Sequence, residues 1–307
     1  MTELVVGSPL PDLRTIVVDL VLRLRMKRGV GSGPVTVDGL RRSAAQLERA
    51  SEGLRVPSFV TVEPEKIGAL EAEWVSVGNP GEGVVLYFHG GGFFMCSPRT
   101  HRPATWRLAR ATGRRVLAIA YRKAPDNAFP AWVDDGAAAF RWLLDAGHRP
   151  ADVVFAGDSA GGNIALAVTH RLRREGAPLP AGLILFSPWA DLGCAGPSYR
   201  KNARRESMFK ADATRSLGEY LTRDCDPRDP EASPVHADLT GFPRMLLFAS
   251  STEIFLDDAR TIARRAHRAG VSAELHVYRN MPHAFPVLAG YLPRAKPAFE
   301  TVARFIE

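Results

Sequence analysis

Cysteine is scarce in this sequence of 307 residues, and its three cysteines match neither a disulfide framework nor a metal site. Cys96, Cys194 and Cys225 lie far apart, without CxxC spacing and without a partner histidine nearby. Disulfide-stapled domains need closely spaced, paired cysteines, and zinc sites need clustered Cys and His ligands. We therefore expect no structural disulfide and no metal ion.

Long apolar runs are also missing from the sequence. No stretch approaches the roughly 18 consecutive apolar residues that would span a bilayer. The first residues, Met1-Thr2-Glu3-Leu4, do not form a basic region followed by an apolar segment, as a secretory leader would. We therefore expect no membrane span and a cytoplasmic location.

Acidic residues are outnumbered, with 33 Asp and Glu against 40 Lys and Arg, which gives a net charge of +7. The basic residues are spread along the chain in short groups, as on solvated helix faces, so nucleic acid is not an expected partner. Hydrophobic residues make up 46% of the chain. That fraction is ample for a substantial core and favours a globular protein.

From about residue 84 onward, short apolar runs alternate with segments of helical period. This alternation is typical of an α/β protein with a mostly parallel central sheet and helices on both faces. The expected strands are 84–88, 116–121, 153–156, 183–187, 245–249 and 274–278. The expected helices are 104–111, 132–144, 161–174 and 257–269.

Two stretches break this alternation. Within residues 13–28, apolar side chains such as Leu13, Val17 and Leu20 recur at helical spacing. Residues 192–234 begin very polar and contain one expected helix at 213–221. We expect residues 1–50 to form a helical cap over the main domain of residues 51–307, to which residues 192–234 contribute. This cap should also hide the apolar stripe of residues 13–28 from solvent. A membrane-surface helix is the alternative for residues 13–28.

The sharpest local motif is Gly157-Asp158-Ser159-Ala160-Gly161, which follows an apolar strand and leads into a helix. Small residues around Ser159 allow a tight, strained turn that exposes its hydroxyl as a nucleophile. Chymotrypsin-type proteases carry a similar GDSGG run, but they are all-β proteins whose histidine precedes the serine. The α/β alternation therefore favours a nucleophile elbow.

A second glycine motif, His89-Gly90-Gly91-Gly92, again follows directly on an apolar strand. Glycines in a row let backbone N–H groups approach a developing oxyanion, which each such donor stabilises by roughly 3 kcal/mol. We expect His89 to fix this loop through hydrogen bonds and not to act as a base.

The base and the acid follow from their order along the chain, which is serine, acid, histidine in this type of enzyme. Among eight histidines, His283 alone lies in a loop just past the last expected strand and near the C-terminus. Three carboxylates follow the strand at 245–249, namely Glu253, Asp257 and Asp258. Glu253 is the preferred acid because Asp257 and Asp258 fit the first turn of a helix, and Asp257 is the alternative.

With these motifs in place, the chain resembles the bacterial hormone-sensitive-lipase-like esterases of the α/β-hydrolase superfamily, from about Val60 to its end. Further matches are Ser97-Pro98-Arg99-Thr100-His101-Arg102, Tyr121-Arg122-Lys123-Ala124-Pro125, Phe129-Pro130-Ala131, Ser187-Pro188-Trp189, Ala232-Ser233-Pro234 and Met281-Pro282-His283. The resemblance implies an α/β-hydrolase fold, an oxyanion hole from the N–H groups of Gly91, Gly92 and Ala160, and a cap of N-terminal helices. By analogy it also implies a homodimer.

Several positions depart from the family pattern: Cys96 stands where relatives usually have Gly, Lys123 replaces a usual Leu, and Asp126-Asn127 replaces a Glu-His pair. None is a triad residue, so they put in doubt the shape of the acyl pocket and not the reaction class. Cys96 is either a reactive thiol or, as we prefer, a small buried filler.

The predicted function is hydrolysis of small carboxylic esters through an acyl-enzyme, with no metal or organic cofactor. Phe93-Phe94-Met95 beside the glycine loop predicts a crowded pocket and short acyl chains. Lactone hydrolysis, deacetylation of a metabolite and amide hydrolysis remain alternatives that share every motif. A non-catalytic binder on the same fold, as in gibberellin receptors, is disfavoured by the presence of His283.

Overall fold

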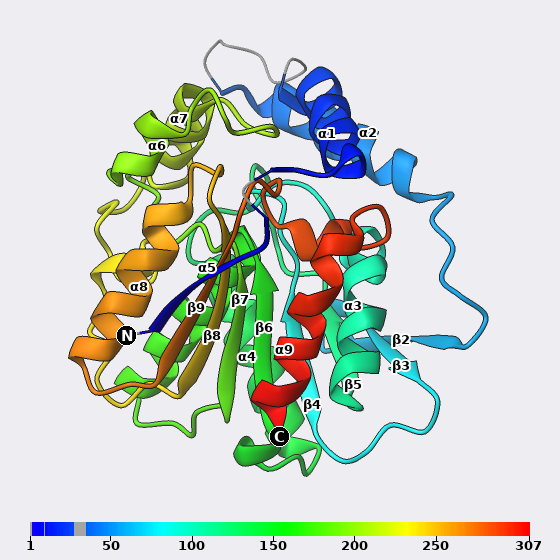
Figure 1. The fold of residues 1–307 in the computed structure, drawn as a ribbon. Helices are drawn as coiled ribbons and strands as arrows, with labels where there is room; N and C mark the ends of the chain where they lie inside the picture. Colours follow the sequence, from blue (N-terminus) through cyan, green and yellow to red (C-terminus); the bar gives the residue numbers. More distant parts are fainter. Residues whose placement is uncertain (1, 9, 28–34) are drawn as a thin grey trace.

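The computed structural model describes residues 2–8, 10–27 and 35–307, whose strands form one central sheet (Figure 1). The strands are β1 (Thr2–Val6), β2 (Val60–Ile67), β3 (Leu70–Val77), β4 (Val84–Phe88), β5 (Arg115–Ile119), β6 (Val153–Asp158), β7 (Gly182–Phe186), β8 (Arg244–Ser250) and β9 (Ala273–Tyr278). The helices are α1 (Leu13–Leu22), continued by the π-helical turn η1 (Arg23–Lys27), α2 (Val37–Ser51), α3 (Pro98–Thr112), α4 (Ala131–Asp145), α5 (Ala160–Arg174), α6 (Pro197–Lys201), α7 (Ala211–Leu221), α8 (Leu256–Arg268) and α9 (Lys296–Ile306).

The strand order across the described part of the sheet is β1-β9-β8-β7-β6-β4-β5-β3-β2. The strands from β1 to β5 in this order run parallel, whereas β3 is antiparallel to β5 and β2 is antiparallel to β3. The prediction of a mostly parallel sheet is therefore confirmed. Parallel strands place their carboxyl ends at one edge, where the predicted site residues follow β4, β6, β8 and β9.

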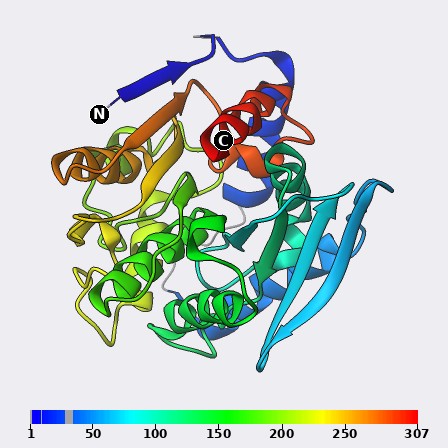
Figure 2. The ribbon, with the colours of Figure 1, turned by 90° about the horizontal axis from the view of Figure 1, so that it is seen from below.

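Side chains alternate between the two faces of the sheet, and each face has its own core. On β4, Val84, Leu86 and Phe88 pack into one cluster, whereas Val85 and Tyr87 pack into the other. Helices α4, α5 and α8 cover the first face, and α3 and α9 cover the second (Figure 2). Burial on both faces explains why these strands are continuous apolar runs.

Three strands at or next to the sheet edges are not predicted by the sequence pattern. β2 carries Pro64 and three charged residues, and only its two end residues are buried, so it lacks an apolar run. β1 is short and pairs with β9 at the opposite edge. The expectation that residues 1–50 form a cap therefore needs correction at its start, because residues 2–6 belong to the sheet.

Helix α3 begins at Pro98, six residues before the predicted start at position 104. At this end the hydroxyl oxygen of Thr100 accepts the N–H of Ser97 (3.0 Å). The hydroxyl of Ser97 donates to the carboxylate of Glu48 on α2 (2.9 Å). Two prolines hide the helical period in the sequence: Pro98 at the first helical position, where proline is well accepted, and Pro103 inside the helix.

Helices α1, α2 and α7 lie above the carboxyl ends of the strands (Figure 1). α1 is attached to the domain through its polar side: Arg23 donates to the carbonyl of Arg204 (2.9 Å), and Lys27 donates to the carbonyls of Ala203 (2.8 Å) and Glu206 (2.6 Å). These charge-assisted hydrogen bonds from η1 act together with apolar packing of α1, in which Leu22 is buried and Val18 packs against the second core cluster.

The apolar stripe of α1 is exposed, which contradicts the expectation that the cap hides it. Leu13 is 75% exposed and Leu20 54% exposed, and Ile16, Val17, Val21 and Leu24 are exposed as well. Thr15, Asp19, Arg23 and Lys27 recur every fourth residue and occupy the side that meets the domain. The sequence pattern gives the helix correctly but not which side faces inward. Arg28, the last residue of the predicted stretch, lies outside the described residues.

Candidate active site

Ser159 lies in a strained turn between β6 and α5. Its φ angle is 54°, in the left-handed region that non-glycine residues avoid. A Cβ on Gly161 would come within 1.9 Å of the carbonyl oxygen of Phe88, so only glycine fits there. The Ser159 N–H donates to the carbonyl of Phe186 at the end of β7 (2.9 Å). The turn is thus held from both sides, and Ser159 is 6% exposed.

The glycine loop after β4 presents unpaired backbone donors. Gly91 has a φ of 117°, and its carbonyl accepts the N–H of Met95 (3.0 Å), which closes the loop. Within the described residues, the N–H groups of Gly91, Gly92 and Ala160 have no acceptor. Ala160 opens α5, so its N–H also lies at the positive end of a helix. Such donors suit an anionic oxygen.

Asp158 joins the glycine loop to the turn that carries Ser159. Its buried carboxylate accepts the hydroxyl of Tyr87 (2.5 Å) and the N–H of Gly90 (3.0 Å), and it faces the ring of His101 (3.3 Å). Burial alone would raise the pKa of Asp158, but the charge and hydrogen bond of His101 and the Tyr87 and Gly90 bonds outweigh it, so the pKa is lowered. The carboxylate therefore remains ionised and ties the two loops together.

His89 is a buried part of the same loop. Its Nδ1 lies 2.7 Å from the carbonyl of Gly90, which can only accept, so Nδ1 carries the proton. The ring stacks on Tyr121 at 4.3 Å, and the Tyr121 hydroxyl donates to the His89 carbonyl (2.7 Å). Burial holds the pKa of His89 well below its usual value. The ring is therefore neutral and braces the loop.

His283 and Glu253 form a buried pair at the ends of β9 and β8. The Nδ1 of His283 lies 2.6 Å from one carboxylate oxygen of Glu253, and the other oxygen accepts the N–H of Ser250 (2.6 Å). The rings of Phe209 and Phe255 pack against the imidazole at 5.2 Å and 4.8 Å. Because Nδ1 donates to Glu253, Nε2 is left as the acceptor.

The environment of His283 favours its charged form. Burial alone would lower the pKa of His283, but the hydrogen bond and charge of Glu253 and the charges of Glu206 and Asp158 outweigh it and raise the pKa. A base with a raised pKa takes a proton readily and stabilises the imidazolium that results.

The turn of Ser159 and the His283 loop meet at the end of β7. Ser159 binds Phe186 there, and the N–H next to His283, that of Ala284, donates to the hydroxyl of Ser187 (3.1 Å). Among the described residues, the buried Nε2 of His283 has no hydrogen-bond partner, and no bond joins it to Ser159. The basic nitrogen and the serine hydroxyl are therefore both available to a third molecule.

The two aspartates that follow Glu253 bind other groups. Asp257 accepts the N–H of Ser198 in α6 (2.7 Å). Asp258 accepts the N–H groups of Ala190 and Asp191 (both 3.0 Å). The geometry thus brings Glu253 and not Asp257 to His283, and the aspartates anchor the segment 190–201 to the start of α8.

The sequence analysis misses one residue beside this pair, Glu206. It lies in a run of charged residues at 204–206, and nothing local separates it from its exposed neighbours. Glu206 is nonetheless only 1% exposed. One carboxylate oxygen accepts the N–H of Ile254, the residue that follows Glu253 (3.1 Å). Glu206 can be recognised only in the structure, where its polar segment folds over the turn that contains Glu253.

Among the three bulky residues after the glycine loop, Phe94 places its ring against Gly92. Phe93 is fully buried and packs against Trp132 at 4.9 Å, so it belongs to the core. The Phe94 ring and the Leu217 side chain on α7 are the nearest neighbours of a Cβ built on Gly92, at 3.2 Å and 3.3 Å. The crowding therefore comes from one loop residue and one residue of the overlying segment.

Cys96, which departs from the family pattern, is a half-buried thiol behind the loop. Burial raises the pKa of Cys96 to about 12. The thiolate is therefore scarce at neutral pH, which disfavours the reactive-thiol interpretation. Lys123, the second departure, donates to the backbone carbonyl of Cys96 and holds the loop from outside.

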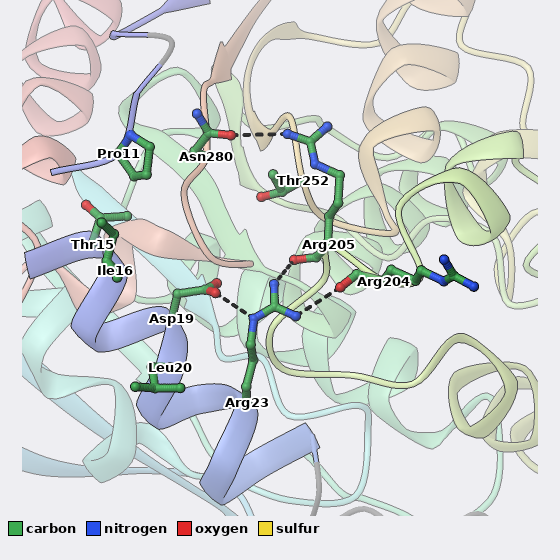
Figure 3. A pocket seen from close by; sticks show the side chains of 10 residues that line it. All are labelled: Pro11, Thr15, Ile16, Asp19, Leu20, Arg23, Arg204, Arg205, Thr252 and Asn280. Carbon is green, nitrogen blue, oxygen red and sulfur yellow. Dashed lines mark hydrogen bonds and ion pairs between the residues drawn. The ribbon is translucent and has the colours of Figure 1, made fainter. Parts of the chain in front are cut away.

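A cavity of about 500 Å³ lies between α1 and the loops that carry the histidine and the acid (Figure 3). Ile16 and Leu20 of α1 form part of its wall, and Thr252 and Asn280 face them from the two loops. Arg205 donates to the side chain of Asn280 (3.1 Å) across it. Ser159, Glu253 and His283 are not among its lining residues.

Comparison with known proteins identifies a matching family, similar sequences and similar solved structures. The family model described as alpha/beta hydrolase fold matches residues 85–287. An acetyl-hydrolase of Streptomyces hygroscopicus is 39% identical over 78% of this chain and 80% of its own, and an esterase of Acinetobacter venetianus is 33% identical over 80% and 82%. The crystal structure of an esterase from the bacterial hormone-sensitive lipase family superposes with a TM-score of 0.89 at 34% identity, covering 97% of this chain and 98% of that one. Esterase EstE5, soaked with p-nitrophenyl butyrate, has a TM-score of 0.89 at 32% identity, covering 96% and 98%.

None of the helices in the described ranges is long and apolar enough to cross a membrane.

Proposed function

Because this chain belongs to the bacterial hormone-sensitive-lipase-like esterases of the α/β-hydrolase fold and is a carboxylesterase-type hydrolase, we propose that Ser159, His283 and Glu253 form its catalytic triad. The observation that carries this proposal is the buried His283–Glu253 pair at 2.6 Å near the strained turn of Ser159, with the Nε2 of His283 unpartnered within the part of the chain that the structure describes. The same geometry gives no comparable role to Asp257.

The proposed reaction proceeds through an acyl-enzyme. Nε2 of His283 takes the proton of Ser159 as its oxygen attacks the ester carbonyl, and Glu253 holds the imidazolium. The N–H groups of Gly91, Gly92 and Ala160 bind the oxyanion. His283 then protonates the departing alcohol, and a water molecule, deprotonated by the same nitrogen, releases the acid. Every proton in this sequence is moved by His283.

The proposed substrates are small esters with short acyl groups. Phe94 and Leu217 stand next to Gly92, where the acyl chain would leave the oxyanion hole. Forcing one more methylene into a filled pocket costs about 1 to 3 kcal/mol, which exceeds the roughly 0.8 kcal/mol gained by burying it. The name of one relative, acetyl-hydrolase, agrees with a short acyl group. Lactones and acetylated metabolites fit the same limits.

We further propose that α1, α2 and α7 act together as the cap of the hydrolase domain, because all three lie above the strand ends (Figure 1). A homodimer and a cytoplasmic location stay predictions from the sequence. The cap would restrict access to Ser159, which is 6% exposed beneath it.

A substrate panel tests the proposed function. The values of kcat/KM for p-nitrophenyl esters from acetate to palmitate would be compared with rates on lactones and acetylated amines. We expect a maximum at roughly two to six carbons and slow cleavage of amides. A maximum at ten carbons or more would contradict the crowded pocket, and faster turnover of lactones or amides would reassign the substrate.

A further inference from the structure

We propose that Glu206 is a positioning residue of the active site: its buried carboxylate holds the turn that carries Glu253 and adds a second negative charge beside His283. This inference rests on the proposed function, because it assigns Glu206 to the same histidine. The residue comes from the segment at 192–234, outside the elements that carry the triad.

Glu206 ties the overlying segment to the acid turn. One of its oxygens accepts the N–H of Ile254 (3.1 Å), and the other accepts the N–H of Met208 (2.8 Å). Two neighbouring groups bind the same turn: Asn202 donates to the carbonyl of Glu253 (2.8 Å), and the Ser198 hydroxyl donates to the carbonyl of Ile254 (2.5 Å). The backbone around Glu253 is therefore fixed on both sides by one short polar segment.

The carboxyl group of Glu206 fits its ionised form. Both oxygens accept backbone N–H groups, and among the described residues the side chain has no acceptor to which a proton on it could be donated. Burial and the like charge of Glu253 raise the pKa of Glu206, while the charge of His283 and the two N–H bonds oppose that rise. A buried carboxylate held in this way gains most when the nearby imidazole becomes an imidazolium.

The charged groups around His283 are mostly negative and stabilise its imidazolium form. Glu253, Glu206 and Asp158 all favour the imidazolium, with Glu253 the largest contributor. Lys27 of η1 donates to the backbone carbonyl of Glu206 (2.6 Å), and its charge also interacts with that of Glu206. Phe209, three residues after Glu206, packs on the imidazole at 5.2 Å and excludes water from it. The screening that weakens surface charges is therefore absent here.

Substitution Glu206→Gln keeps the shape and removes the charge. The neutral form of His283 is the base, so kcat/KM falls as the pH drops through the pKa of His283. Removing a negative charge should shift this acid limb to lower pH by about one unit and reduce kcat at the plateau about tenfold. Glu206→Asp keeps the charge and should restore the position of the limb.

Glu231→Gln is the matched control. Glu231 is another buried glutamate of the same segment, but it pairs with Arg171 on α5 (3.0 Å). We expect this variant to lose thermal stability and keep the acid limb of wild type. An equal shift in both variants would show that general loosening of the segment moves the limb, and it would overturn the role of Glu206.

The experiment would follow p-nitrophenyl acetate hydrolysis from pH 5 to 9, together with an NMR titration of the His283 imidazole. An unmoved limb with kcat within twofold of wild type overturns the proposal. If Glu206→Gln does not fold, Glu206→Asp carries the test, since its shorter arm cannot reach both Ile254 and Met208, and unchanged kcat would overturn the positioning role. If the wild type cleaves no ester, the proposed function fails, whereas the NMR titration still tests whether Glu206 raises the pKa of His283.

Discussion

The strand ends and helix α1 are held in place in different ways. Ser159 is fixed by the backbone of neighbouring buried strands, because its N–H binds the Phe186 carbonyl. Helix α1 buries Leu22, and long side chains of the following turn η1, Arg23 and Lys27, reach the carbonyls of the segment at 203–206, while most of its apolar stripe is exposed. The position of Ser159 therefore depends on the sheet, whereas the position of α1 depends in large part on a few polar contacts at one end.

The largest expected effect comes from the group most firmly fixed by the sheet. Ser159→Ala should reduce kcat by roughly 10⁴ to 10⁶ without loss of fold, because no other group replaces the nucleophile. Steady-state hydrolysis of p-nitrophenyl acetate and a melting curve measure both quantities. Activity within tenfold of wild type would overturn the proposed mechanism.

Substitution of the two acids that follow β8, Glu253 and Asp257, should distinguish an effect on catalysis from an effect on stability. Glu253→Gln should reduce kcat by about three orders of magnitude with a small change in Tm, because the imidazolium loses its counter-charge and its orientation. Asp257→Asn should keep kcat within a few-fold and cost about 1 kcal/mol of stability, since Asp257 binds the Ser198 N–H. The opposite ranking would transfer the acid role to Asp257.

The sequence predicts the features that follow the buried strands better than those held by contacts between distant segments. The turn at Ser159, the glycine loop and the loop of His283 follow buried strands whose apolar runs are visible in the sequence. Glu206 and the orientation of α1 depend on contacts between segments far apart in the chain, such as Lys27 with the carbonyl of Glu206. The amphipathic pattern of α1 predicts a helix, but it does not show that the polar side of this helix contacts the hydrolase domain.

A smaller effect is expected where the cap meets the oxyanion loop. Leu217→Ala on α7 removes a wall next to Gly92 and should shift the preferred acyl length upward by one or two carbons. Each additional methylene that finds room gains about 0.8 kcal/mol, or roughly fourfold in kcat/KM. Phe94→Ala should act in the same direction from the loop. A preference that stays unchanged in both variants would remove these two residues from the acyl pocket.

The smallest effect on stability is expected for substitutions on the exposed stripe of α1. These substitutions test most directly how α1 is held on the domain. Leu13→Gln and Val17→Gln replace apolar side chains that already face solvent, so the free energy of unfolding should change by less than about 0.5 kcal/mol.

Arg23→Met is the matched change on the attached side of the same helix. It removes the donors to Asp19 and to the carbonyls of Arg204 and Arg205, and it should cost about 1 kcal/mol and expose α1 to proteolysis. Melting curves and limited proteolysis of the three variants would be compared with wild type. If the glutamine variants destabilise the chain more than Arg23→Met does, the apolar stripe and not the polar side holds the helix, and the contrast between cap and sheet fails.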